Sequence, residues 1–345
     1  MQVECARSAP THERACRGAG GDDVDGAKAC GDAREVLAQC RLCPRACGVN
    51  RTGGEVGVCG ADGTVRVARA ALHFWEEPCI SGCAGSATVF FSYCPLQCVY
   101  CQNRAIAAGD AGVKVTVARL AQIYLELAAL GARNINLVTP THYVPQIIES
   151  LSLARSAGLA LPVVYNTSGY ESAETIALLA GVVDIYLTDF KYADPLLASR
   201  YSHAPDYPEV AIAALDAMVA QVGLCAFEEA AVDDDEPSRL LRGVIVRHLM
   251  LPGCVDDSKA IVALLHKRYG DAIRMSLMNQ YTPVAALPEY PELATRVPDT
   301  DYEALLDFAD EIGVQDYYWQ EGGAAEESFI PAFDNTGVLG SELEL

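Results

Sequence analysis

Beyond residue 115 the chain alternates between two hydrophobic periodicities, and this alternation constrains the fold more than any other feature. In the segment 116–132, apolar residues recur three or four positions apart and the run ends at a glycine, as in an amphipathic helix. The segment 134–140 follows directly as a short apolar run of strand length. Strands connected by crossover helices pair in parallel, so the alternation predicts a parallel sheet with helices outside it.

The same pattern continues towards the C-terminus. Further helices are predicted at 143–159, 173–181, 210–225, 258–270 and 302–312, and further strands at 162–169, 182–191, 243–253 and 272–281. With a strand-like run at 87–91 there are about six strand and helix units. We therefore expect an α/β protein built as a partial (β/α)6 barrel, whose functional side chains lie at the C-terminal ends of the strands.

The rest of the sequence divides into distinct parts. Residues 1–33 show neither helical nor strand periodicity, which predicts a disordered extension. Residues 34–83 form a small Cys-rich N-terminal module with glycine-punctuated turns. The predicted barrel occupies 84–320, with an acidic loop inserted near 227–240, and 321–345 form a C-terminal tail.

Composition narrows the classes of function. The 345 residues include 46 Asp and Glu against 25 Lys and Arg, a net charge of -21 that disfavours binding to nucleic acid. No apolar window is long enough to span a membrane, and the first residues lack the apolar core of a secretory signal, so we expect a cytoplasmic protein. In such a protein the 14 cysteines are more plausibly metal ligands or reduced thiols than disulfides.

Three cysteines lie in the segment FFSYCPLQCVYCQNRA, residues 90–105, with the spacing C-x3-C-x2-C: Cys94, Cys98 and Cys101. A cubane of four irons normally takes four thiolates, so a loop with three leaves one iron open to a substrate or cofactor. The spacing differs from that of ferredoxins and from the paired C-x2-C units of structural zinc sites. Because the loop follows the strand-like run 87–91, we expect it at the catalytic end of a barrel strand.

This loop resembles the cluster loop of the radical S-adenosylmethionine (SAM) superfamily, with an aromatic residue, Tyr100, immediately before the third cysteine. The resemblance implies a partial barrel of the radical SAM type in which the open iron of a 4Fe-4S cluster chelates SAM. It further implies that the reduced cluster cleaves SAM to methionine and a 5'-deoxyadenosyl radical, which abstracts hydrogen from a substrate. The cofactor supplies this chemistry, and the protein orients it and excludes water.

Over residues 40–281 the chain is most similar to a branch grouped beside the pyruvate formate-lyase activating enzymes. The matching segments are CRLCPRACGVNR, EEPCISG, INLVTPTHYVP, YNTSGYE, DIYLTDFKY, RYSHAPDYP, VRHLMLPG and SLMNQYTP. The resemblance implies an oxidoreductase that activates a glycyl radical enzyme, with an electron donor such as flavodoxin or ferredoxin and a protein substrate. Two alternatives stay open: radical modification of a small molecule or peptide, and a non-catalytic iron-sulfur protein for electron transfer or redox sensing.

Polar residues at two strand ends are candidates for binding SAM. By resemblance, Thr139, Pro140 and Thr141 line the position that meets the methionine amino group. Asn166 and Ser168, in YNTSG, are short polar groups for the ribose hydroxyls or the carboxylate, although a plain turn explains them equally well.

Charged residues mark two later strand ends. Asp189 and Lys191 alternate along a predicted strand, so both side chains point to one face. Burying them unpaired at the end of an apolar strand would be costly, so we expect them to meet each other, a cofactor or a substrate in a catalytic site. Arg247 and His248 point to opposite faces, and the resemblance favours His248 as the catalytic residue on the cofactor side.

A second set of cysteines precedes the barrel: Cys40, Cys43, Cys47 and Cys59. Four thiols within twenty residues could close tetrahedrally around zinc or hold a second iron-sulfur cluster. The alternative is a module whose thiols are reduced and partly buried without metal.

Overall fold

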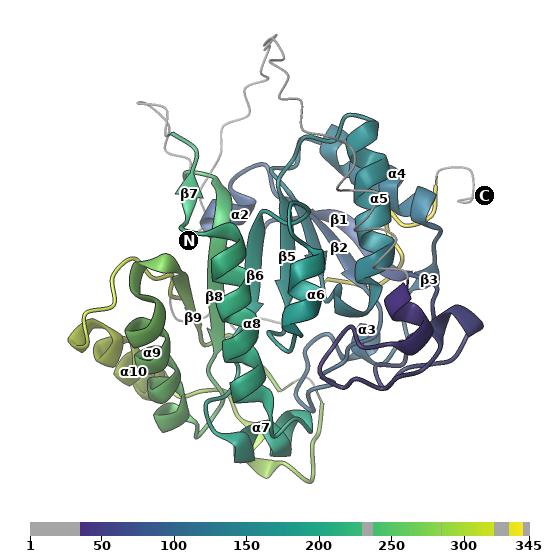
Figure 1. The fold of residues 1–345 in the computed structure, drawn as a ribbon. Helices are drawn as coiled ribbons and strands as arrows, with labels where there is room; N and C mark the ends of the chain where they lie inside the picture. The colour runs from purple at the N-terminus through teal and green to yellow at the C-terminus, as the bar shows by residue number, and fades with distance from the viewer. Residues whose placement is uncertain (1–34, 230–236, 284, 321–330, 341–345) are drawn as a thin grey trace.

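The computed structural model describes residues 35–229, 237–283, 285–320 and 331–340 (Figure 1). The predicted extension over 1–33 lies outside the described residues, as do parts of the acidic insertion (230–236) and of the C-terminal tail (321–330 and 341–345). No helix in the described ranges is long and apolar enough to cross a membrane.

Six parallel strands form the centre of the molecule and pair in the order in which they occur in the chain. They are β2 (Ser86–Phe91), β4 (Ile135–Val138), β5 (Val163–Thr167), β6 (Ile185–Asp189), β8 (Leu240–Leu249) and β9 (Arg274–Met278). Sequential pairing through crossover helices is the topology of a partial (β/α)6 barrel, so the predicted fold class is confirmed.

Three antiparallel strands extend the parallel sheet in the described part of the chain. β1 (Arg66–His73) pairs with β2, and β3 (Val113–Lys114) pairs with β1 beyond it. β7 (Ala226–Phe227) pairs with β8 beside the acidic insertion.

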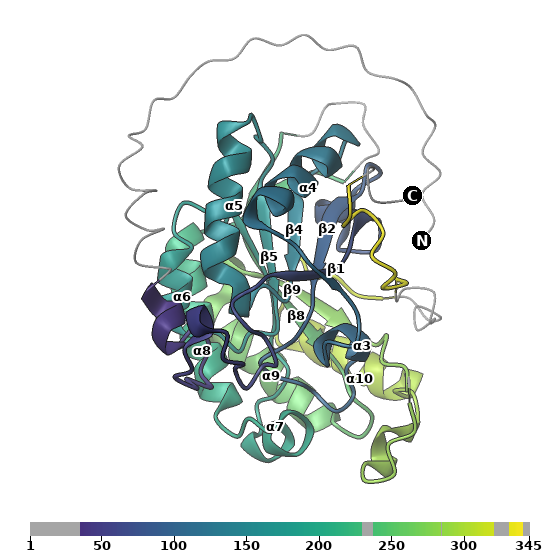
Figure 2. The same cartoon turned by 90° about the vertical axis from the view of Figure 1, so that its right-hand side faces the viewer.

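Helices cover the outer face of the sheet, as Figures 1 and 2 show. The long ones are α4 (Val117–Ala129), α5 (Val144–Ser156), α8 (Tyr207–Val222), α9 (Val255–Tyr269) and α10 (Asp299–Glu311). Shorter helices are α2 (Pro78–Ser81), α3 (Arg104–Ala107), α6 (Ala173–Leu178) and α7 (Pro195–Ser202). Single 3-10 turns are η1 (Val36–Gln39), η2 (Arg51–Gly53), η3 (Thr141–Tyr143), η4 (Gly270–Ala272) and η5 (Pro291–Ala294).

Helix α4 illustrates how the sequence specifies these elements. Its N-cap, Thr116, accepts a hydrogen bond from the Arg119 backbone N–H, which satisfies one of the unpaired donors of the first turn. The apolar residues spaced three or four apart face the sheet and are buried, including Leu120, Ile123 and Leu127.

The first part of the N-terminal module, which contains η1 and η2 and is drawn in purple in Figure 2, lies at the same end of the molecule as α3 and α7, whereas β1 of the same module belongs to the sheet. The Thr175 hydroxyl donates to the Leu42 carbonyl, and the Gln146 amide donates to the Gly63 carbonyl. These bonds attach the module to α6 and α5 on the outside of the barrel.

Residues 331–340 return to the opposite edge of the sheet. The Ala70 N–H donates to the Thr336 carbonyl, and the Asn335 N–H donates to the Ala68 carbonyl, so this segment runs beside β1. Val338 is fully buried there. The described part of the predicted tail is therefore packed against the domain.

Candidate active site

A cavity of about 250 Å³ opens at the C-terminal ends of the parallel strands. Its walls bring together most of the residues predicted to form the site, although they come from four different strand ends and loops. Those lining it are Cys94, Cys98, Cys101, Tyr100, Thr139, Asn166, Ser168, Asp189 and Lys191.

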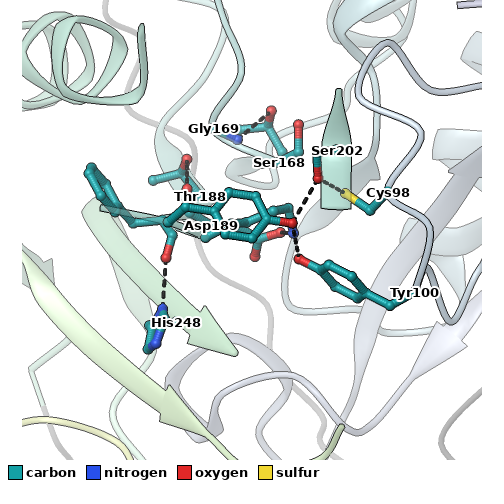
Figure 3. Close-up of polar contacts among 12 residues, drawn as sticks. Cys98, Tyr100, Ser168, Gly169, Thr188, Asp189, Ser202 and His248 are labelled. Atoms are coloured by element: carbon teal, nitrogen blue, oxygen red, sulfur yellow. Dashed lines mark hydrogen bonds and ion pairs between the residues drawn. The ribbon is translucent and has the colours of Figure 1, made fainter. Parts of the chain in front are cut away.

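The three-cysteine loop leaves β2 and is held by α7. The Ser202 hydroxyl donates to Cys98 Sγ at 3.0 Å and lies 2.7 Å from the Tyr192 hydroxyl (Figure 3). Tyr192 in turn donates to the Tyr100 hydroxyl at 2.8 Å. The Val99 N–H donates to the carbonyl of Tyr201 in α7. These contacts fix the loop and place a hydrogen-bond donor on one of its sulfurs.

Two thiols of this loop, those of Cys94 and Cys101, have little tendency to ionise by themselves. Burial, followed by the neighbouring thiols, raises the pKa of Cys94 to about 11 and that of Cys101 to about 12. Iron must therefore displace the thiol protons when it binds. No three His, Cys, Asp or Glu side chains of the described residues converge on the position of a single ion. Each iron of a cubane takes one thiolate, so three thiols spread around one cavity fit a cluster.

Asp189 and Lys191 form an ion pair at the end of β6, with Lys191 Nζ 2.5 Å from Asp189 Oδ2. Their side chains are 30% and 15% exposed, and both line the cavity. Burial alone would lower the pKa of Lys191, but the negative charge of Asp189 outweighs it and raises the pKa well above its usual value. Lys191 is therefore a permanent positive charge beside the cluster loop.

The ends of β4 and β5 are tied together behind the cavity by Glu171. This carboxylate accepts hydrogen bonds from the hydroxyls of Thr141 (2.6 Å) and Thr167. Burial raises the pKa of Glu171 to about 7, although the hydroxyl donors partly oppose the shift. Thr141 thus supports the site from behind, and neither it nor Pro140 lines the cavity.

Thr139 stands at the rim with a φ of 57°, which is rare for a β-branched residue. Its N–H donates to the Asn166 carbonyl, which joins the two strand ends that line the cavity. Such strain at a cavity wall is typical of a residue positioned for a ligand. Gly169 lies nearby with a φ of 79°, and an added Cβ would lie 2.2 Å from the Asp189 carbonyl oxygen, so only glycine permits this close packing of β5 on β6.

His248 lies away from the cavity, on the helix side of β8 (Figure 3). Its Nδ1 is 2.9 Å from the Phe190 carbonyl oxygen, and its Nε2 is 2.8 Å from the Ser258 hydroxyl. Burial lowers the pKa of His248 to about 4, so the ring is neutral at pH 7. His248 connects the end of β6 to α9 through these two hydrogen bonds. It could therefore affect catalysis only indirectly, by positioning the end of β6.

Arg247, in contrast, lines the cavity. The resemblance favoured His248 on the cavity side of β8, and this expectation was wrong. The alternation along a strand shows only that the two residues diverge, and packing against α9 decides the direction. Arg247 forms ion pairs with Glu76 and Glu77, and the Asn136 amide donates to Glu76 at 2.8 Å. Sequence reasoning missed Glu76 as a lining residue, although it belongs to the EEPCISG segment.

Part of the chain is similar in sequence to a known family. Residues 88–222 match the Radical SAM superfamily, and this segment begins in β2, ends in α8 and contains the three-cysteine loop. An uncharacterized protein of Methanocaldococcus jannaschii is 27% identical over 295 residues, which cover 83% of this chain and 78% of that protein.

Two solved structures show a partial likeness in fold. A radical SAM methyltransferase from Sphaerobacter thermophilus aligns with a TM-score of 0.47 and 17% identity, over 69% of this chain and 67% of that one. SuiB of Streptococcus suis aligns with a TM-score of 0.42 and 13% identity over 69% of this chain, which spans about half of SuiB (49%). The match to the Radical SAM superfamily covers residues 88–222, less than half of the chain, and includes the three-cysteine loop, so it is a similarity of this segment.

Proposed function

We propose that this protein cleaves SAM reductively and directs the resulting radical to a substrate. The observation that carries the proposal is the composition of the cavity wall. Three cysteines, and no fourth among the described lining residues, face the same cavity as the hydroxyl, amide and charged groups of the β4, β5 and β6 ends. A non-catalytic electron-transfer protein would have no use for such a polar cavity beside an open iron.

One group of residues would bind the cluster, and another would bind SAM. Cys94, Cys98 and Cys101 would hold a 4Fe-4S cluster, which supplies the electron that breaks the sulfonium bond and gives methionine and a 5'-deoxyadenosyl radical. Thr139, Asn166 and Ser168, which line the cavity at the strand ends, would bind the amino-acid and ribose groups of SAM.

The charged and aromatic parts of the wall have separate tasks. Lys191, fixed by Asp189, gives a positive charge that can meet a carboxylate. Tyr100 covers one side of the cavity and is itself fixed through Tyr192. Aromatic walls exclude water from the path of a radical.

Activation of a glycyl radical enzyme is the finer form of this proposal. The sequence resemblance supports it, and so does a second, open cavity of about 820 Å³ that shares Cys98, Cys101 and Ala107 with the first. An opening of this size beside the cluster loop is compatible with entry of a polypeptide. Flavodoxin or ferredoxin would supply the electron in the cytoplasm. Modification of a small molecule or peptide is the alternative.

The test is anaerobic reconstitution with iron and sulfide, followed by dithionite and SAM and chromatography for 5'-deoxyadenosine. We expect product from the wild type and none above background from Cys98→Ala. Cys225→Ala is the matched control, because Cys225 is also a free cysteine but lies outside the cavity. Equal product from wild type and Cys98→Ala would contradict the proposal.

The finer form has its own test. The reconstituted protein is incubated with SAM, dithionite and pyruvate formate-lyase and examined by EPR. A glycyl radical doublet would support activation. Formation of 5'-deoxyadenosine without a doublet would favour another substrate.

A further inference from the structure

The four cysteines of the N-terminal module lie outside both the cavity and the segment that matches the superfamily. Three are buried and Cys47 is partly exposed, and all four are free thiols. Cys43 lies close enough to Cys59 and Cys40, and Cys40 close enough to Cys47, for the thiols to interact electrostatically. Gly57 lies between Cys47 and Cys59, because a Cβ there would be 3.4 Å from both sulfurs. The chain therefore gathers four thiols into one small site.

Backbone hydrogen bonds bring three of these cysteines onto one folded loop. The Cys40 N–H donates to the Val49 carbonyl oxygen at 3.0 Å, and the Gly48 N–H donates to the Cys40 carbonyl oxygen at 2.9 Å. Between them the chain turns at Cys43, whose carbonyl oxygen accepts from the Ala46 N–H at 2.9 Å. Cys40, Cys43 and Cys47 therefore lie on the same loop, residues 40–49.

The Cys40 sulfur faces a cation. Arg51 is almost fully buried, and its Nη1 lies 4.0 Å from Cys40 Sγ. The same Nη1 donates to the His142 carbonyl oxygen, and Nε and Nη2 donate to the Asp62 carbonyl oxygen. One guanidinium cannot balance four thiolates, three of them buried, and burying the remaining charges without a further cation would be prohibitive.

We propose that Cys40, Cys43, Cys47 and Cys59 ligate a metal centre of their own, with thiophilic zinc or iron as its metal and Arg51 as its buried countercharge. In the described residues these four sulfurs do not converge on the position of one ion, and neither do those of the three-cysteine loop. Metal binding must therefore rotate the cysteine side chains inward. The site does not depend on the proposed SAM chemistry.

The proposed centre is connected to the active site through Arg45, which follows Cys43 by two residues. The Arg45 side chain donates to the carbonyl oxygens of Pro95 (3.1 Å), Ser202 (3.0 Å) and His203 (2.6 Å). Pro95 lies within the three-cysteine loop, and Ser202 is the residue that donates to Cys98. The metal centre therefore fixes the residue that clamps the cluster loop onto α7.

The test uses a full-length chain without the radical SAM cluster, made by Cys94→Ala, Cys98→Ala and Cys101→Ala together. It is purified anaerobically, and its zinc, iron and acid-labile sulfide are measured per chain. We expect about one zinc, or iron with comparable sulfide, to remain. Adding Cys40→Ser and Cys47→Ser should reduce the metal to background, whereas adding Cys225→Ser should not. Absence of zinc and iron from the triple variant would overturn the proposal.

A second measurement guards against loss of folding in the cysteine variants. The triple variant is treated with a chelator, reduced, and titrated with Co²⁺. Tetrahedral thiolate ligation would give visible d–d absorption and sulfur-to-cobalt charge-transfer bands in the near ultraviolet. Absence of both would overturn the proposal. These results are independent of 5'-deoxyadenosine formation, so failure of the proposed SAM chemistry would not be confused with failure of this site.

Discussion

The Ser202 hydroxyl donates a hydrogen bond to Cys98 Sγ across 3.0 Å, which joins α7 to a sulfur of the proposed cluster (Figure 3). Hydrogen bonds to the sulfurs of an iron-sulfur cluster stabilise its reduced, more negative state. Ser202→Ala should therefore lower the reduction potential of the cluster. A fall of about 60 mV would decrease the reduced-to-oxidised ratio about tenfold at a fixed donor potential.

The measurement is an EPR-monitored redox titration of wild type and Ser202→Ala, with iron content determined in both. Ser156→Ala is the matched control, because the Ser156 hydroxyl bonds only within α5, to the Ser152 carbonyl. An unchanged potential in Ser202→Ala would show that the hydrogen bond does not act on the cluster.

The Asp189 and Lys191 pair should support SAM cleavage without holding iron. Lys191→Ala removes the positive charge beside the cavity and leaves Asp189 without its partner. We expect 5'-deoxyadenosine formation to fall about 10- to 100-fold, as is usual when a charge-assisted contact is lost from a partly buried site. Iron content should stay at the wild-type level. Full activity in this variant would exclude a role for the charge.

Glu171 should make stability depend on pH. Its pKa is about 7 in the folded chain against 4.5 for the free side chain, so the folded state binds more protons between these values. Stability therefore falls as pH rises from about 4.5 to 7 and levels off above that. Glu171→Gln keeps an acceptor for Thr141 and Thr167 and removes the charge, so its stability relative to wild type should rise by up to about 3 kcal/mol over this range.

Urea unfolding of wild type and Glu171→Gln at pH 5 and pH 8 measures the difference. Glu174→Gln, at an exposed position of α6, is the control and should show almost no pH-dependent difference. If the difference in free energy of unfolding between Glu171→Gln and wild type were the same at pH 5 and pH 8, Glu171 would already be ionised at pH 5.

Arg45 should position the cluster loop. Arg45→Ala removes three hydrogen bonds to carbonyl oxygens near the loop, and Arg45→Lys keeps the charge but cannot reproduce the planar set. We expect both variants to change the EPR spectrum of the reduced cluster proposed at Cys94, Cys98 and Cys101, with the larger change in Arg45→Ala. The metal proposed for the N-terminal module should remain. An EPR spectrum of Arg45→Ala identical to that of the wild type would contradict the proposal that Arg45 positions the cluster loop.

The sequence predicted the barrel because its signals are local. The apolar spacing of Leu120, Ile123 and Leu127 and the alternation of strand and helix runs directly encode burial and parallel pairing. The cysteine loop could also be predicted from the sequence. Its spacing indicates the type of ligand, and its position after β2 indicates its location in the fold.

Contacts between distant segments were harder to predict. Glu76 is held at the cavity by its ion pair with Arg247, which lies about 170 residues away in the sequence. No local sequence pattern around either residue predicts this pair. The orientation of His248 depends on Ser258 of α9, and the support that Glu171 gives to Thr141 depends on how two loops meet. Such positions follow from tertiary packing rather than from periodicity.

The central claim is that one iron of the cluster at Cys94, Cys98 and Cys101 is kept open for SAM. The most direct measurement is electron-nuclear double resonance on the reduced wild-type cluster with SAM labelled by ¹⁵N in the amino group and ¹⁷O in the carboxylate. We predict hyperfine coupling from both labels, because both groups would bind the open iron. Absence of coupling from either label, with the cluster fully assembled and SAM in excess, would contradict the account.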